Sequence, residues 1–77
     1  MIPDEREYGP QPLDSLMNER DMPNHTLVAA STEQLTHKMV SKARRGRFLS
    51  VQVRLKILRA WNKATQQNAT LKDLFSY

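Results

Sequence analysis

Apolar residues recur at helical spacing along much of the chain, and capping or turn-forming residues separate the runs. The clearest run has steps of four, three and three residues between Val51, Leu55, Leu58 and Trp61. This spacing predicts a helix with one apolar face, which Ile57 widens. Ser50 precedes the run as a suitable N-cap, and the pattern fades between residues 62 and 65.

Two shorter helices are expected near the start of the chain. The first runs from about residue 12 to residue 20, and its apolar positions are Leu13, Leu16 and Met17. Its opening proline suits a first helical turn, where a missing N–H group costs nothing. Pro23 ends this segment, and Asn24 is the expected N-cap of a second helix that holds Leu27 and Ala30 on one face.

A third helix is predicted over residues 36–46, after a polar turn. Thr36 is its candidate N-cap, and Gly46 can supply the left-handed residue that ends it. Its expected core contacts are Leu35, Val40 and Ala43. In the short connection that follows, we expect Phe48 or Leu49 to enter the core.

The last predicted helix is a single turn. Thr70 and Asp73 have the spacing of a capping box, and the apolar residues beside them are Leu71, Leu74 and Phe75. No strand is predicted. The sequence therefore predicts an all-α fold, a compact bundle of about five short helices over residues 12–77. Residues 1–11, which lack apolar periodicity, are expected to form a flexible acidic arm.

Charge is distributed very unevenly along the chain. Residues 1–33 carry seven acidic and two basic side chains, whereas residues 34–77 carry ten basic side chains and one acidic one. No carboxylate lies between Glu33 and Asp73. This asymmetry favours a polyanionic partner, with nucleic acid first and an acidic membrane surface second. The alternative is a solvated helical surface that happens to lack acids.

Several classes of site are not expected. No arrangement of nucleophile, base and acid is visible, and two glycines are too few for a phosphate-cradling loop, so we do not expect an enzyme or a cofactor. His25 and His37, without any cysteine, do not form a metal set. The chain has no long apolar run for a membrane span, and the acidic start does not resemble a signal peptide, so a cytoplasmic location is expected.

Three motifs carry a resemblance to a known family. Residues 35–46 read LTHKMVSKARRG, which keeps the spacing V-S-x-x-x-V-S-x-x-x-x-G with Leu and Thr in the first two places. Residues 56–62 read KILRAWN, similar to K-I-A-K-A-L-G, and residues 69–75 read ATLKDLF, similar to V-S-L-D-E-L-F. In this order they resemble the lambda-repressor-like helix-turn-helix domain of the Cro or XRE type. The resemblance spans residues 13–75.

The resemblance implies a DNA-binding helix-turn-helix of bacterial or phage type, with residues 36–46 as the recognition helix. The connection from Leu27 to Leu35 is longer than the family usually has. The family's glycine near that turn is absent, so Ser31 or Thr32 is expected in its place.

Candidate DNA contacts follow from the way a helix enters the major groove, where its early residues reach base edges. The expected base contacts are His37, Lys38, Ser41 and Lys42. Lysine can donate to guanine O6 or N7, serine can donate or accept, and histidine can donate. The expected phosphate contacts are Thr36, Arg44, Arg45 and Arg47. The alternatives are ordinary surface for the polar residues and favourable charge at a helix C-terminus for the arginines.

The leading hypothesis is sequence-specific binding of double-stranded DNA by a small transcriptional regulator. A homodimer is possible, with candidate contacts at Leu74, Phe75 and Tyr77, unless these residues close the monomer core. The second hypothesis is a protein-interaction adaptor or antitoxin built on the same fold. The third is peripheral membrane binding through residues 50–65, which conflicts with the need for Val51, Leu58 and Trp61 inside.

Overall fold

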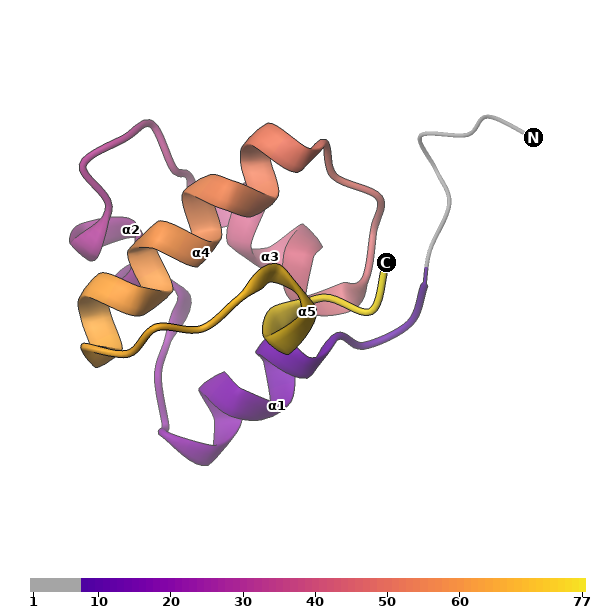
Figure 1. Ribbon diagram of the computed structural model, residues 1–77, viewed down its shortest axis with the longest axis horizontal. Coiled ribbons are helices and arrows are strands. Elements are labelled where there is room, and N and C mark those ends of the chain that lie inside the picture. The colour runs from indigo at the N-terminus through magenta and orange to yellow at the C-terminus, as the bar shows by residue number, and fades with distance from the viewer. Residues whose placement is uncertain (1–7) are drawn as a thin grey trace.

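The computed structural model describes residues 8–77. This part of the chain contains five α-helices and no strand, and the all-α prediction is confirmed; the helices are α1 (Pro12–Glu19), α2 (Asn24–Ala30), α3 (His37–Arg45), α4 (Val51–Thr65) and α5 (Leu71–Leu74). Helix α4 is the longest and contacts α2, α3 and α5, while α1 contacts α3 and α5 (Figure 1). The result is a compact bundle in which every helix has at least two neighbours.

A single hydrophobic core joins all five helices. Its largest member is Trp61, whose side chain is 1% exposed. The other buried apolar residues are Leu13, Met17, Leu27, Leu35, Val40, Ala43, Ile57, Ala60, Leu74 and Phe75. The predicted core positions in and before α3 are therefore confirmed, and so is the placement of Trp61 inside.

The apolar face of α4 is rotated from the predicted one. The helix buries Ile57, Ala60 and Trp61, whereas Val51 is 46% exposed and Leu55 is half-buried. At 100° per residue, Val51 and Leu55 lie about 120° and 160° around the helix from Ile57. The stripe inferred from Val51 and Leu55 was therefore wrong, and the core face instead centres on Ile57.

The predicted helix ends are mostly confirmed. The side chain of Ser50 accepts a hydrogen bond from the backbone of α4, and Asp73 accepts one from the backbone N–H of Thr70 at 2.8 Å. The prediction for Asn24 was wrong, because Pro23 is the N-cap and Asn24 is the first helical residue. The side-chain oxygen of Asn24 is used elsewhere, as a hydrogen-bond acceptor for α3.

The segment before α1 is anchored to the bundle. The backbone N–H of Tyr8 donates to the carbonyl of Gly46 at 2.7 Å. The side chain of Gln11 is 2% exposed, and its oxygen accepts a hydrogen bond from the backbone N–H of Ser76 at 2.6 Å. The ordered contacts thus begin four residues before the predicted domain start. The rest of the predicted acidic arm, residues 1–7, lies outside the described residues.

The C-terminal residues close the core. Leu74 is 0% and Phe75 is 3% exposed, so neither offers a surface for a second copy, and the core-closing alternative is confirmed for both. Tyr77 is half-buried and lies against the connection between α3 and α4. In that connection Leu49 packs against the core, whereas Phe48 is 41% exposed.

The hydroxyl group of Tyr77 links two points of this connection. It donates to the carbonyl of Arg47 at 2.9 Å and accepts from the backbone N–H of Leu49 at 3.2 Å. Partial burial raises the pKa of Tyr77, and repulsion between the negative charges of the ionised Tyr8 and Tyr77 hydroxyls adds to the increase. The hydrogen bond from Leu49 and the charge of Arg54 lower the pKa but do not cancel the effect of burial.

The αL residue at the end of α3 should tolerate no side chain. Gly46 has φ of 89°, and a Cβ atom there would overlap the backbone carbonyl of Gly9. Gly9 also has a positive φ, of 80°, but a Cβ atom there would meet open space. We expect Gly46→Ala to lower the free energy of unfolding by at least about 2 kcal/mol more than Gly9→Ala does. Urea denaturation of both variants measures the difference, and equal losses would contradict the close approach.

Stability should also fall at alkaline pH because of Tyr77. Its pKa is higher in the folded chain than in the unfolded one, so the stabilisation is complete below about pH 10 and is lost as the pH rises through the folded pKa. The wild-type free energy of unfolding should therefore decline more steeply above pH 10 than that of Tyr77→Phe. Denaturation at several pH values compares the two, and parallel curves would exclude this group as the cause.

Candidate nucleic-acid interface

Helix α3 is fixed along one side and at both ends. Val40 and Ala43 are 0% exposed and hold its inner face in the core. At its start, the hydroxyl oxygen of Thr36 accepts a hydrogen bond from the backbone N–H of Met39 at 3.1 Å, as predicted for the N-cap. At its end, the left-handed Gly46 allows two backbone bonds back into the last turn, which is a Schellman arrangement. The outer face is therefore presented on a rigid helix.

The eight predicted DNA contacts divide by exposure. The exposed ones are Thr36, His37, Lys38 and Arg45. The half-buried ones are Ser41, Lys42, Arg44 and Arg47. Because residues three and four apart share one side of a helix, the face opposite Val40 combines Lys38, Lys42 and Arg45. The structure thus brings three basic side chains onto one side of α3, with His37 and Ser41 beside them.

Few of the basic groups near α3 are neutralised. Within residues 8–77 the ion pairs are Arg44 with Asp14 and Arg59 with Glu33. The basic side chains of this region that have no carboxylate partner among those residues are Lys38, Lys42, Arg45 and Arg47. Their charge is available to a polyanion approaching the outer face.

Arg44 has a structural role that the sequence did not reveal. Its guanidinium donates to Asp14 at 2.6 Å, to Asn18 at 2.7 Å and to Asn24 at 2.8 Å. These partners lie on α1 and α2, so one side chain ties three helices together. A phosphate would have to compete with all three acceptors, and we therefore leave Arg44 out of the proposed contacts. A sequence signal exists in Asp14 and Asn18, which are one turn apart on α1.

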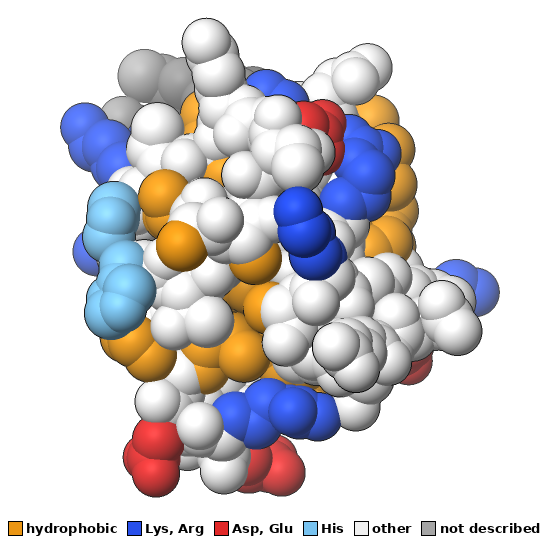
Figure 2. Space-filling view, turned by 90° about the vertical axis from the view of Figure 1, so that its left-hand side faces the viewer, with side chains coloured by type: hydrophobic (Ala, Val, Ile, Leu, Met, Phe, Trp, Pro, Cys, Tyr) orange, Lys and Arg blue, Asp and Glu red, His pale blue; other side chains and the backbone are white. Residues whose placement is uncertain are grey.

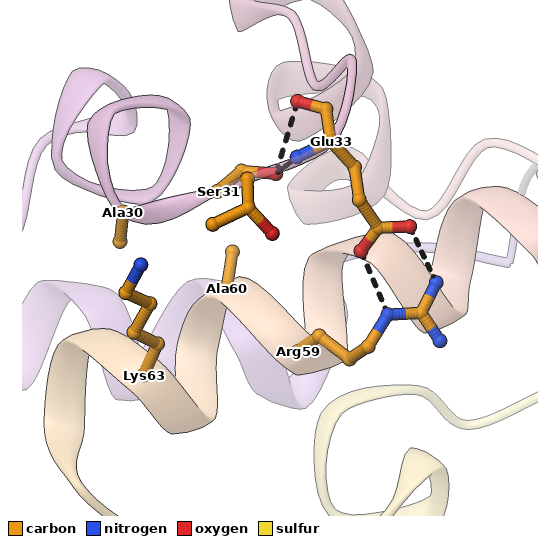
Figure 3. Close-up of a pocket in the computed structure, with 7 residues that line it drawn as sticks. Ala30, Ser31, Glu33, Arg59, Ala60 and Lys63 are labelled. Atoms are coloured by element: carbon orange, nitrogen blue, oxygen red, sulfur yellow. Dashed lines mark hydrogen bonds and ion pairs between the residues drawn. The ribbon is translucent and has the colours of Figure 1, made fainter.

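The connection between α2 and α3 has its own anchor. The carboxylate of Glu33 accepts two hydrogen bonds from the guanidinium of Arg59 on α4, both at 2.7 Å (Figure 3). The hydrogen bond from Arg59, more than the attraction of nearby charges, lowers the pKa of Glu33, although partial desolvation acts against it. The same pair raises the pKa of Arg59. Glu33 is the last acid before the basic stretch, and its pairing removes Arg59 from the free charges.

Neither residue expected in place of the family's turn glycine has the left-handed backbone that a glycine allows. Ser31 has φ of −74° and ψ of 137°, which is extended backbone, and Thr32 has no positive φ either. Instead, the hydroxyl oxygen of Ser31 accepts from the backbone N–H of Glu33 at 3.0 Å, a local bond that shapes the chain without glycine. The connection covers residues 31–36, longer than the three or four residues common in a helix-turn-helix. The helix-turn-helix itself stays a prediction, although α2 and α3 do contact each other.

A small hollow lies between the end of α2 and α4. Its volume is about 150 Å³, and it is lined by Ala30, Ser31, Thr32, Glu33, Arg59, Ala60 and Lys63. Figure 3 shows the Glu33–Arg59 pair at one side of it and Lys63 at the other. The hollow is smaller than a typical small-molecule site, and its carboxylate is already paired.

Basic charge does not cover the whole molecule. Figure 2 views the side that lies at the left of Figure 1, and there Lys and Arg side chains are interspersed with acidic and apolar ones. Acidic side chains appear at the lower rim and also near the top of this face, and histidine side chains lie at one flank. This mixed face is a poor match for a polyanion, which leaves the outer face of α3 as the better candidate.

Comparisons add no independent identification. No protein-family model, no curated protein and no solved structure matches the chain. The resemblance of the three motifs to the Cro or XRE type therefore stays a prediction. None of the helices described in residues 8–77 has both the length and the apolar character needed to span a bilayer. The same residues contain no group of three or more His, Cys, Asp or Glu side chains that could hold a metal ion.

Substitution of the two adjacent arginines at the end of α3 should lower the stability of the fold by very different amounts. Arg44→Ala removes three hydrogen bonds between helices, one of which is also an ion pair, and we expect it to lower the free energy of unfolding by about 2 kcal/mol. Arg45→Ala, at an exposed position, should change it by less than about 0.5 kcal/mol. Thermal and urea denaturation of the two variants test this, and similar values for both would refute the tie between α1, α2 and α3.

Proposed function

We propose that this chain is a double-stranded DNA-binding module that reads the major groove with α3. One observation supports it most: the face of α3 opposite Val40 carries Lys38, Lys42 and Arg45, with no ion-pair partner among residues 8–77. A single α-helix fits the width of the major groove. A helix whose inner face is buried can enter the groove without unfolding any of the bundle.

The proposed roles differ along the helix. The base-reading positions are His37, Lys38, Ser41 and Lys42, near the N-terminal half of α3. Thr36 caps the helix with its oxygen and can still donate its hydroxyl proton to a phosphate. Arg45 and Arg47 are the proposed phosphate contacts at the other end. Phosphate contacts contribute affinity and salt dependence, whereas base contacts contribute sequence choice.

The resemblance to Cro or XRE domains supports the same reading of α3 and suggests a small transcriptional regulator. The resemblance also rests on the order of the three motifs along the chain, which is support separate from the charge of α3. The long connection between α2 and α3 is the feature that departs from the family. Its anchoring by Glu33 and Arg59 offers a way to hold α3 in place without the usual short turn.

Selection from a random pool of duplexes with the purified chain is the direct experiment. We expect enrichment of a defined sequence, and the selected duplex then serves for salt titration. The logarithm of the association constant should fall with the logarithm of salt concentration, with a slope of about −0.9 per phosphate contact. A pool that stays unenriched and a chain that binds no duplex at low salt would refute the proposal.

The variants should separate the two kinds of contact. Lys42→Ala and His37→Ala should change sequence preference by about 1–3 kcal/mol at the affected base pair. Arg45→Ala and Arg47→Ala should weaken binding on all duplexes alike, and each should flatten the salt slope by about 0.9. Fluorescence anisotropy on the selected and a scrambled duplex measures both effects. If all four variants behave alike, the proposed reading face is misplaced.

The alternative function is a protein-interaction adaptor or antitoxin, in which the same basic face meets an acidic protein. Absence of duplex binding at low salt would favour it. Membrane-surface binding through α4 has less support, because Trp61 is buried and only Val51 is largely exposed along that helix's apolar positions. Vesicle binding by the intact chain, in lipid mixtures with and without anionic headgroups, distinguishes this last possibility.

A further inference from the structure

Helix α4 has a second apolar stripe, which the core does not use. Val51 is 46% exposed, and Leu55, one turn later, is half-buried without packing against the core of residues 8–77. The two residues lie about 120° and 160° around the helix from the core residue Ile57. Phe48, which is 41% exposed, precedes the helix by three residues. We call Phe48, Val51 and Leu55 the outer stripe.

The start of the outer stripe is ordered by contacts with Tyr77. The ring of Phe48 lies 6.0 Å from that of Tyr77, centroid to centroid, and the guanidinium of Arg54 lies 4.8 Å from the Tyr77 ring. Arg54 also donates to the backbone carbonyls of Leu49 at 3.2 Å and Tyr77 at 3.0 Å. Because Arg54 is three residues after Val51 on α4, these contacts place the ring of Phe48 near the start of the stripe. A partner that binds there loses little freedom in ordering the surface.

A basic stripe runs beside the outer stripe. Helix α4 contains four basic residues and no acidic one. Lys56, Arg59 and Lys63 lie about 100–160° from Ile57, in the opposite rotational direction to the outer stripe. Arg59 is paired with Glu33, as Figure 3 shows, whereas Lys56 and Lys63 form no ion pair among the described residues. The apolar side chains are therefore bordered by positive charge that nothing in this part of the chain neutralises.

We propose that the outer stripe of α4 is the docking site for an acidic amphipathic helix of another protein. The apolar side of that helix covers the outer stripe, and its carboxylates pair with Lys56 and Lys63. These two lysines are seven residues apart, about 10 Å along the axis, so acids two turns apart on the partner match them. Exposed apolar clusters often mark a contact with another molecule, and aromatic residues are enriched in protein interfaces. The basic border selects an acidic partner.

A protein helix suits this surface better than a lipid bilayer does. Binding to the interface of a bilayer grows with the apolar area that is inserted. The largely exposed apolar side chains of the stripe are only two, Phe48 and Val51. Side chains one turn apart on a helix, such as Val51 and Leu55, instead form a ridge against which the groove of a second helix packs.

The docking site is separate from the proposed DNA-reading face. Helices α3 and α4 turn Val40 and Ile57 toward the same core, so the outer face of each helix points away from that core. The partner helix can therefore bind with or without a duplex on α3. The proposal goes beyond the proposed function and does not depend on it.

The test uses the full chain and a fluorescein-labelled synthetic helix about as long as α4, with leucine along one face and glutamate on both sides of it. One control peptide has lysine in place of glutamate, and the other has alanine in place of leucine. The variants are Val51→Glu and Lys63→Gln, with Lys38→Gln on α3 as the control for loss of an exposed lysine. Val51 is the first residue of α4, where a glutamate favours the helix, so Val51→Glu should keep the wild-type unfolding midpoint.

We expect the wild-type chain to bind the leucine–glutamate peptide at least about tenfold more tightly than either control peptide, as measured by anisotropy. Val51→Glu should weaken this binding by about tenfold, because it removes an apolar contact and adds repulsion. Lys63→Gln should weaken it by about threefold, and Lys38→Gln should leave it unchanged. A wild-type chain that does not bind the peptide, or that binds the alanine peptide equally well, overturns the proposal. An equal loss in Lys38→Gln and Lys63→Gln overturns it as well.

Two measurements detect the other possible occupants. Sedimentation of the wild-type chain at twice 8.9 kDa, with the dimer lost in Val51→Glu, would assign the surface to a second copy. Binding to vesicles with anionic headgroups, lost in the same variant, would assign it to a membrane. Either result overturns the proposal.

Duplex titrations of the same variants separate this proposal from the proposed function. Val51→Glu should bind the selected duplex as tightly as the wild-type chain does, whereas Lys38→Gln should bind it more weakly. A wild-type chain that binds the peptide but no duplex refutes DNA binding and supports the docking site. A parallel loss of duplex and peptide binding in Val51→Glu would show that the two sites are not separate, and would overturn the proposal.

Discussion

The backbone crossing at Gly46 is the contact on which the placement of α3 depends. The segment before α1 runs so close to this residue that a Cβ atom would meet the carbonyl of Gly9, and Tyr8 donates a backbone hydrogen bond to Gly46 there. One residue, Gly46, therefore meets two requirements. It adopts the left-handed conformation that ends α3, and it permits the close approach that anchors the N-terminal segment. Any side chain at this position would disturb both.

The two halves of α3 have different roles. The C-terminal half serves the fold: Ala43 is buried, and Arg44 ties α1 and α2 to the helix. The N-terminal half is held by Met39, Val40 and the cap at Thr36, and its side chains at His37 and Lys38 are exposed. A recognition helix needs this division, because residues that read bases cannot also be occupied by structural hydrogen bonds. The basic stretch is thus a mixture of structural and available charges.

Local chemistry explains why much of the fold was predictable. Thr36, Gly46 and Ser50 act through the nearest turn of backbone, so their roles are visible in short stretches of sequence. Contacts between residues far apart in the sequence could not be predicted in this way. The face of α4 that is buried depends on which neighbours contact it, and the pairing of Arg59 with Glu33 depends on the path of the α2–α3 connection. For the candidate site, the exposed positions of α3 followed from periodicity, whereas the three acceptors of Arg44 required the structure.

The proposed DNA binding requires that the outer face of α3 meets the duplex. Nuclear magnetic resonance of the ¹⁵N-labelled chain, titrated with its selected duplex, tests this most directly through the backbone amide shifts. The largest changes should fall on residues 36–47, strongest near Lys38 and Lys42, with the amides of Ile57 and Ala60 in the core little changed. Changes centred on α1 or α5, with α3 unaffected, would contradict the central claim.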